Sequence, residues 1–266
     1  MPHLPVNGLN LHYDLAGQAD PPVIFLHGLG SSAADWALQI PVFAPRHRVI
    51  TLDLRAHGET SNPNGGFTIE QMADDVAGLL ARLEQPPAHV VALSLGGCVA
   101  LALALHHSPR VQSLTLVNTF ARYRPAGARS LYRQLKRVYL LYFAPMTRVA
   151  EFIAGGLFPK PEQHLYREAA IARLSKNHKS TYFAAIRALV RFNALDQLSA
   201  IRQPTLIVAG DRDTTVSLSA KETLHRAIPH SRLLIIPNSG HATPYDQFEV
   251  FNKEVLEFIE RLKDKG

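Results

Sequence analysis

The stretch HVVALSLGGC, residues 89–98, gives the strongest indication of how this chain folds. The apolar residues before Ser94 favour a buried strand, and the apolar residues 99–105 after it favour a helix. Ala92 lies two positions before Ser94, and Gly96 lies two positions after it. A sharp turn from strand to helix needs small residues at both positions, because larger Cβ groups would collide as the two elements pack together. The stretch therefore predicts a nucleophile elbow, with Ser94 as the candidate nucleophile.

Short apolar runs of strand length recur on both sides of this stretch, and helix-like segments separate them. Such runs are typical of strands that are buried on both faces of a mainly parallel sheet. Residues 4–6 and 9–15, divided by Asn7-Gly8, predict an N-terminal hairpin that forms an antiparallel edge. The sequence therefore predicts an α/β fold, and the expected buried strands are residues 23–26, 49–52, 90–93, 114–117, 205–208 and 233–236.

The spacing of apolar residues predicts helices that cover this sheet. Thr68 and Gln71 form a capping-box pattern ahead of an apolar helical face, which indicates a crossover helix between the second and third runs. Residues 248–262 repeat apolar side chains at a period near 3.6. This second pattern predicts a C-terminal helix that packs on the sheet.

A histidine and an acid complete the chemistry that Ser94 requires. A serine hydroxyl is a poor nucleophile at neutral pH unless a neighbouring base takes its proton. Asp213 follows the run 205–208 and His241 follows the run 233–236, so Ser94, Asp213 and His241 all fall at carboxyl ends of predicted strands. We predict a catalytic triad in which His241 is the general base and Asp213 orients the histidine.

Two backbone amides are predicted to form an oxyanion hole. The tight turn after Ser94 directs the amide of Leu95 towards an anion near the serine. In His27-Gly28-Leu29-Gly30 the glycines let the backbone approach a bound carbonyl, and we assign the amide of Leu29. A donor about 3 Å from the developing oxyanion contributes several kcal/mol to the transition state.

Residues 120–200 interrupt the alternation of strands and helices. The segment is rich in Arg, Tyr and Leu at helical spacings, with glycines and prolines as breaks. It lies between two predicted strands, over the carboxyl ends where open α/β sheets place their ligand crevice. We therefore predict a helical lid at 120–200, inserted before the last strands of a core domain made of residues 1–119 and 201–266.

The positive charge of the chain is concentrated in this insertion. Residues 121–198 contain 14 Lys and Arg against 4 Asp and Glu, a net of +10, whereas the whole chain carries +6. A solvated helical face is the favoured interpretation, because Arg and Lys at helical spacing often lie over apolar surface. A field that attracts anionic substrates is the alternative. No nucleic-acid-binding motif accompanies the charge, so we expect no nucleic-acid partner.

Composition narrows the class of protein further. A chain of 266 residues that is 47% hydrophobic and 19% charged can bury a large core, which excludes a disordered chain. The single Cys98 cannot form an internal disulfide, and residues 1–13 lack the pattern of a secretory signal. No apolar stretch is long enough to span a bilayer. We expect a cytoplasmic protein that does not bind membranes, with no metal site and no cofactor, since the histidines lack metal-ligand spacing.

Five segments of the chain resemble successive signature segments of the α/β-hydrolase superfamily: residues 27–30, 53–58, 92–97, 210–213 and 240–241. The stretch 67–118 most resembles small carboxylesterases and 3-oxoadipate enol-lactonases. Ala56 and Ala92 stand where such relatives often have glycine. The resemblance implies the α/β-hydrolase fold and a carboxylic ester hydrolase that acts on a small-molecule ester through an acyl-serine intermediate.

Several alternatives stay open at the level of the sequence. Asp211 competes with Asp213 for the role of the acid, although the Gly-x-x-Asp spacing of the resemblance favours Asp213. Some lipases carry the acid after the preceding strand, where this chain has Asn118. The same triad also serves enol-lactonases, carbon–carbon bond hydrolases and perhydrolases, and the same fold serves non-catalytic ligand receptors. A dehalogenase or an epoxide hydrolase would need aspartate in place of Ser94.

Overall fold

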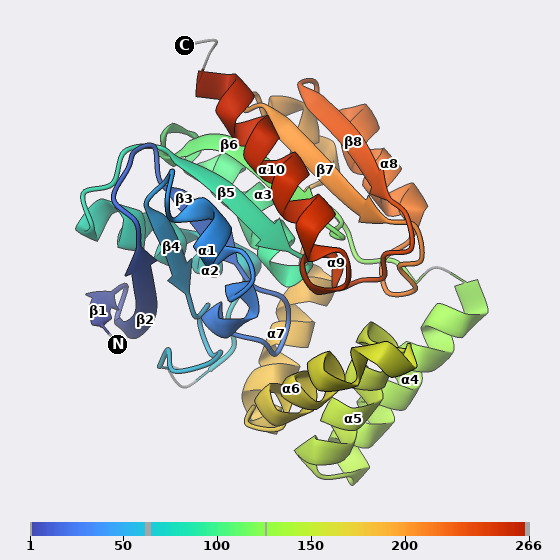
Figure 1. Ribbon diagram of the computed structural model, residues 1–266. Helices are drawn as coiled ribbons and strands as arrows, with labels where there is room; N and C mark the ends of the chain where they lie inside the picture. Colours follow the sequence, from blue (N-terminus) through green and yellow to red (C-terminus); the bar gives the residue numbers. More distant parts are fainter. Residues whose placement is uncertain (1, 62–64, 126, 264–266) are drawn as a thin grey trace.

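The computed structural model describes residues 2–61, 65–125 and 127–263, which form an eight-stranded, mainly parallel sheet with helices on both faces (Figure 1). The strand order is β1-β2-β4-β3-β5-β6-β7-β8. The predicted fold class is confirmed. The strands are β1 (His3–Val6), β2 (Leu9–Ala16), β3 (Val23–Leu26), β4 (Val49–Leu52), β5 (Ala88–Leu93), β6 (Val111–Val117), β7 (Thr205–Gly210) and β8 (Ser231–Ile236).

The predicted N-terminal hairpin is the antiparallel edge of the sheet. β1 pairs with β2, and β2 pairs antiparallel with β4, whereas all later strand pairs are parallel. Asn7 and Gly8 form the two-residue turn with φ of 49° and 77°. Positive φ at both central positions is what a tight hairpin turn requires, and Asn followed by Gly is the residue pair that adopts it most readily.

The opposite edge of the sheet differs from the sequence expectation. Residues 233–236 were predicted as a buried strand, but in β8 only Ile236 is buried, and Ile235 is 46% exposed. The physical reason is position: β8 is the last strand of the sheet and pairs with β7 alone. An apolar run therefore indicates a strand here without indicating that both of its faces are covered.

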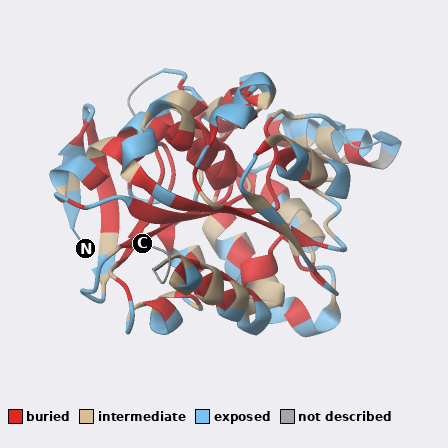
Figure 2. Ribbon diagram, turned by 90° about the horizontal axis from the view of Figure 1, so that it is seen from above, coloured by how far each residue is buried: buried red, intermediate tan, exposed pale blue. Residues whose placement is uncertain are grey.

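Helices cover the sheet in two layers, and the buried strands lie between them when the molecule is seen from above (Figure 2). On one face α2 (Ile69–Arg82), α3 (Leu95–His106) and α8 (Leu218–Ala227) contribute to one apolar cluster. On the other face α10 (Phe248–Lys263) packs with the aromatic side chains of Trp36 and Phe43. The short helices α1 (Ile40–Phe43) and α9 (Thr243–Asp246) complete the core.

The capping box predicted for the crossover helix is present at the start of α2. The Gln71 backbone N–H donates to Thr68 Oγ1 at 3.2 Å, and the Thr68 backbone N–H donates to Gln71 Oε1 at 3.1 Å. These reciprocal bonds satisfy two amide groups that the first turn of a helix otherwise leaves unpaired.

The helical insertion, residues 120–200, follows β6 and leads into β7 (Figure 1). Its two ends lie side by side, because Arg122 and Asn193 form an antiparallel bridge and the Ala194 N–H donates to Ala121 O at 2.9 Å. Ala126 of the predicted lid, and residues 1, 62–64 and 264–266 of the predicted core, lie outside the described residues. The helices are α4 (Gly127–Phe143), α5 (Met146–Leu157), α6 (His164–Leu174) and α7 (Lys179–Arg191).

None of the helices in the described part of the chain combines the length and the hydropathy that crossing a bilayer requires.

Candidate active site

Ser94 occupies a strained turn between β5 and α3. Its backbone has φ 54° and ψ −110°, a region that residues with a Cβ rarely adopt. The turn brings Gly96 against the preceding parallel strand, where its N–H donates to His27 O at 3.1 Å. A Cβ at position 96 would overlap the carbonyl oxygen of Leu26. The predicted need for a very small residue after the serine therefore has a direct structural cause.

The structure brings the three predicted catalytic side chains together. His241 Nε2 lies 3.0 Å from Ser94 Oγ, and His241 Nδ1 lies 2.9 Å from Asp213 Oδ2. A carboxylate is a hydrogen-bond acceptor, so Nδ1 carries the proton and Nε2 is left to accept the proton of the serine hydroxyl. This chain of contacts has the geometry of a serine activated by a histidine.

Asp213 is held by more partners than His241 alone. Its Oδ1 accepts the backbone N–H groups of Thr215 at 2.8 Å and Val216 at 3.1 Å. Its Oδ2 also accepts from Lys221 Nζ at 2.8 Å. Burial alone would raise the pKa of the Asp213 carboxyl, but His241 and Lys221 hold that pKa well below its ordinary value. The carboxylate is therefore ionised throughout the range in which the histidine can act as a base.

Sequence reasoning missed Lys221. The signal for it was weak: Lys221 lies three residues before Leu224 on α8, and so on the face that packs against the sheet. A lysine at such a position is ordinarily expected to extend towards solvent rather than to be buried.

Asp211, the competing acid, has a different role in the structure. Its Oδ1 accepts the backbone N–H of Ser239 at 3.0 Å, which joins the turn after β7 to the turn after β8. The start of α8 is capped by Ser217, whose Oγ accepts from the Ala220 N–H at 3.3 Å. The contact with His241 thus belongs to Asp213.

Asn118 is a second residue whose importance the sequence did not reveal. It is fully buried at the end of β6, and its Nδ2 donates to the His241 carbonyl at 2.9 Å and to Thr243 Oγ1 at 2.8 Å. Its Oδ1 accepts the Gly210 N–H at 2.9 Å. Asn118 therefore ties the carboxyl ends of two strands to the segment that carries His241.

Leu29 and Leu95, the predicted oxyanion donors, lie on the two turns that meet at Ser94. Leu95 is the first residue of α3, and a Cβ on Gly28 would lie 3.8 Å from the Ser94 Cβ. Among the hydrogen bonds of the described residues, neither amide donates to another protein group. Both N–H groups are therefore available to a ligand oxygen.

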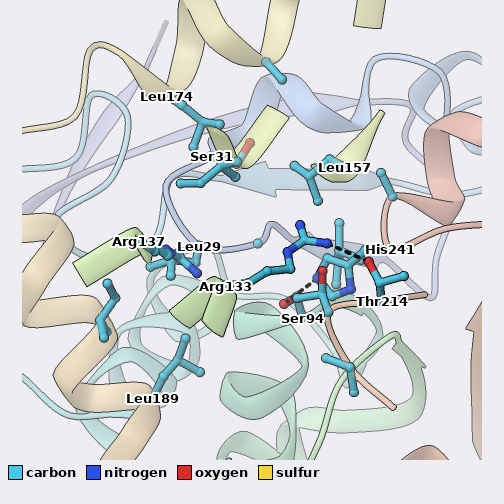
Figure 3. A pocket seen from close by; sticks show the side chains of 18 of the residues that line it. Leu29, Ser31, Ser94, Arg133, Arg137, Leu157, Leu174, Leu189, Thr214 and His241 are labelled. Atoms are coloured by element: carbon cyan, nitrogen blue, oxygen red, sulfur yellow. Dashed lines mark hydrogen bonds between the residues drawn. The ribbon is translucent and has the colours of Figure 1, made fainter. Parts of the chain in front are cut away.

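A pocket of about 270 Å³ opens at Ser94 and His241 (Figure 3). The core contributes its floor, and the helical insertion contributes much of its wall. The apolar part of the lining includes Leu29, Phe120, Phe152, Leu157, Phe158 and Leu189. The site is therefore a largely apolar cavity with the reactive groups at one point, as is usual for small-molecule enzymes.

Two arginines of α4 also line this pocket and point into it in Figure 3. Arg133 donates to Thr214 Oγ1 at 2.9 Å, and Arg137 donates to the Tyr182 hydroxyl. Neither has a carboxylate partner among the described residues, whereas Arg173, which also lines the pocket, pairs with Asp35 at 3.1 Å.

The expectation of a solvated basic face does not hold for Arg133 and Arg137. A Cβ on Gly156 would overlap the Arg133 guanidinium, so this glycine leaves the space that the arginine fills. Arg137 lies over the Tyr182 ring, 5.1 Å from its centroid. Packing between helices of the insertion therefore turns these two arginines inward.

In the part of the chain that the structure describes, the other reactive groups are not arranged for metal binding or thiol chemistry. Among the described residues, no group of three or more His, Cys, Asp or Glu side chains could hold a metal ion. Burial raises the pKa of the Cys98 thiol to about 12, and its Sγ donates to the Phe120 carbonyl at 3.3 Å. Cys98 packs as a small buried side chain.

Comparison with known proteins agrees with this architecture. The pattern of the α/β hydrolase fold family matches residues 21–248. The chain is 30% identical to 3-oxoadipate enol-lactonase 2 of Acinetobacter baylyi, covering 94% of this chain and 93% of that protein. It is 32% identical to a protein of Variovorax paradoxus provisionally named carbamate hydrolase RutD, covering 96% and 98%.

Two solved structures are also similar along nearly their whole length. The enol-lactonase of Burkholderia xenovorans has a TM-score of 0.89 and 26% identity, covering 97% of this chain and 100% of that one. A malate-bound thermophilic esterase of Thermogutta terrifontis has a TM-score of 0.83 and 27% identity, covering 98% and 97%. With the sheet and the strand-end site described above, these matches show that the chain belongs to the α/β-hydrolase family and is a hydrolase.

Proposed function

We propose that this hydrolase cleaves carboxylic esters of small molecules through an acyl-serine intermediate. The observation that carries the proposal is the continuous contact from Ser94 Oγ through His241 to Asp213, with distances of 3.0 Å and 2.9 Å, at one end of an apolar pocket. Ser94 is the nucleophile, His241 is the general base, and Asp213 holds the imidazole in the tautomer that the reaction needs.

The reaction begins when His241 Nε2 accepts the Ser94 proton as Oγ attacks the ester carbonyl. The carbonyl oxygen becomes an oxyanion, and the free amides of Leu29 and Leu95 are the proposed donors to it. His241 then gives its proton to the departing alcohol, which leaves an acyl group on Ser94. Water, activated by the same imidazole, attacks this acyl group and releases the acid.

The pocket supports substrates with a short or medium apolar part. We propose that the helical insertion, residues 120–200, acts as a lid that completes the wall of the pocket and selects the substrate. Its apolar side chains, such as Phe152 and Leu189, remove hydrocarbon from water, while the core supplies the reacting groups. A cavity of about 270 Å³ suits a compact molecule.

A second candidate is the hydrolysis of a lactone or ester that carries a carboxylate, as an enol-lactonase would perform. The observation that favours it is the inward position of Arg133 and Arg137, neither of which pairs with a carboxylate among the described residues. Two guanidinium groups in a largely apolar pocket favour an anionic ligand. The named activity of the relative 3-oxoadipate enol-lactonase 2 agrees with this candidate.

The first experiment measures hydrolysis of nitrophenyl esters with acyl chains of increasing length by the native protein and by Ser94→Ala. We expect turnover that depends on chain length and falls by at least about 10³-fold in the variant, because no other group can form the acyl intermediate. Thermal unfolding of both proteins controls for folding. A folded native protein that turns over none of these esters would overturn the simple esterase proposal.

A second experiment separates the two candidates. The native protein is given pairs of esters and lactones that differ only in whether a neutral group or a carboxylate ends the chain. If kcat/KM is higher for the charged member of each pair, the carboxylate-bearing substrate is supported. If the neutral member is preferred throughout, the plain carboxylesterase is supported instead.

A further inference from the structure

Lys221 is a fully buried lysine that the reaction described above does not use. Its side chain has 0% exposure, and the Asp213 side chain that it contacts has 1%. The Lys221 Nζ atom lies 2.8 Å from Asp213 Oδ2, the same oxygen that lies 2.9 Å from His241 Nδ1. One carboxylate oxygen therefore serves both the buried ammonium and the imidazole.

Burying the Lys221–Asp213 ion pair costs free energy, because both charges lose their contact with water. Burial lowers the pKa of the Lys221 ammonium, and the Asp213 carboxylate opposes that shift. Two buried charges must recover through their mutual contact what they lose by leaving water, and an apolar pair of similar volume often gives equal or greater stability. The helix α8 could pack on the sheet at this position with an apolar side chain.

We propose that Lys221 is a positioning residue of the triad: it holds Asp213 in line with His241 and offsets the carboxylate charge that faces the imidazole. This inference rests on the proposed function, in which His241 takes the proton of Ser94.

The geometry supports both parts of the proposal. Asp213 Oδ1 accepts two backbone amides, those of Thr215 and Val216, and Oδ2 accepts from Lys221, so the carboxylate is oriented before His241 contacts it. A lone carboxylate would stabilise a protonated imidazole strongly. With the ammonium on the same oxygen, the pair carries no net charge, and the protonated imidazole gains less.

Other charged groups lie near the triad, and replacing Lys221 alone removes none of them from the protein. Asp246 accepts the Gly240 N–H at 2.6 Å, and burial raises its pKa. Further charged groups near the site are Asp211 on the turn after β7, Lys160 near Asn238, and the pocket-lining residues Asp35, Arg133, Arg137 and Arg173.

The test is the pH dependence of kcat/KM for a neutral nitrophenyl ester, measured for the native protein, Lys221→Met and Lys221→Gln. We expect the acidic limb of the profile to move to higher pH by about one unit in both variants, because a nearby cation has been removed. Lys221→Gln should keep more of the plateau kcat than Lys221→Met, because its amide can still donate to Asp213.

The matched control is Lys253→Met, which removes the same charge from an exposed position on α10 and should leave the acidic limb unmoved. A purely structural lysine would lower thermal stability without moving the profile. The role of Lys221 would be overturned if Lys221→Met folds and its acidic limb is unchanged. If its activity still depends on Ser94, the proposed esterase is left intact. Activity that survives in Ser94→Ala would instead overturn the proposed function.

A measurement on the native protein covers the case in which the variants do not fold or no ester is turned over. In protein labelled with ¹⁵N-lysine, a buried ammonium exchanges slowly with solvent and gives a separate Nζ resonance. We expect this resonance to shift with pH at the same midpoint as the His241 ring resonances, because both groups contact one oxygen. A Lys221 resonance that does not respond while His241 titrates would overturn the proposal.

Discussion

The polar side chains at the strand ends of the core and those of the helical insertion differ in how they are hydrogen-bonded. At the edge of the core these polar groups have protein partners: Asp213 accepts from four donors, and the Asn118 side chain bonds to Gly210 and to the segment that carries His241 and Thr243. In the insertion, Arg133 and Arg137 reach the same pocket but have only hydroxyl partners. Under the proposed function, this difference leaves the core to fix the reacting groups and leaves the insertion with polar groups that a ligand can reach.

Within helix α4, the placement of charged and apolar side chains is also unusual. Arg133 and Arg137 face the pocket, whereas several large apolar side chains of the same helix are exposed. A surface helix ordinarily buries its apolar stripe and exposes its charges. The exposed apolar residues of α4 are Leu131, Tyr132, Leu135, Val138, Tyr139, Tyr142 and Phe143.

The largest expected effect comes from the core. Asp213→Asn should lower kcat by about 10³–10⁴-fold, because an amide can present the wrong group to His241 Nδ1 and favour the wrong tautomer. Steady-state kinetics with the best nitrophenyl ester measures this loss. Asp211→Asn, two residues earlier on the same turn, is the matched control and should retain most of the activity. A larger loss in Asp211→Asn than in Asp213→Asn would reverse the assignment of the acid.

The next largest effect is expected from the buried hydrogen bonds of Asn118 that join the strand ends. Asn118→Ala leaves the Gly210 N–H and the His241 carbonyl without their buried partner, so we expect a loss of about 3 kcal/mol in the free energy of unfolding. The positive φ of 45° at this position adds to the loss, because alanine adopts it less readily than asparagine. Denaturant unfolding measures the change. Wild-type stability in the variant would show that the three segments hold their positions without Asn118.

A smaller and more selective effect is expected in the insertion. Arg133→Met should raise KM about 10-fold for a carboxylate-bearing ester and leave KM for the neutral ester nearly unchanged, because one charge-assisted hydrogen bond is lost. The kinetics of matched charged and neutral esters measures the ratio. Arg148→Met removes an exposed arginine of α5 that pairs with Glu151 and serves as the control. An equal rise in KM for both esters would show that Arg133 maintains the shape of the pocket and does not bind the substrate carboxylate.

The smallest effect is expected on the outer side of α4. Tyr139→Ser replaces a side chain that is 60% exposed, so the free energy of unfolding should change by no more than about 0.5 kcal/mol. Leu141→Ala on the buried side of the same helix should cost about 2–5 kcal/mol. Thermal or denaturant unfolding compares the two variants. Similar losses in both would mean that the outer face of α4 is covered in solution.

Features that depend on local rules could be predicted from the sequence. The turn at Ser94 follows from Gly96, whose side chain would collide with the neighbouring strand, and the hairpin turn follows from Asn7-Gly8. The meeting of Ser94, Asp213 and His241 also follows, because each lies on the turn that follows a strand and parallel strands end at one edge of the sheet.

The positions of Lys221, Asn118 and Arg133 could not be predicted in this way. Whether Lys221 and Arg133 face solvent, the sheet or the pocket depends on the rotation of α8 and α4 about their axes, and packing with distant segments sets that rotation. Asn118 matters because of partners 92 to 125 residues away in the chain.

Strand burial and turn sterics act between near neighbours, so the α/β framework, the order of the reactive residues and their place after the strands follow from the order of amino acids. Which charges enter the site, and which strand is half exposed, depend on tertiary packing. Those outcomes depend on desolvation and packing between elements that are far apart in the chain, and no local pattern records them.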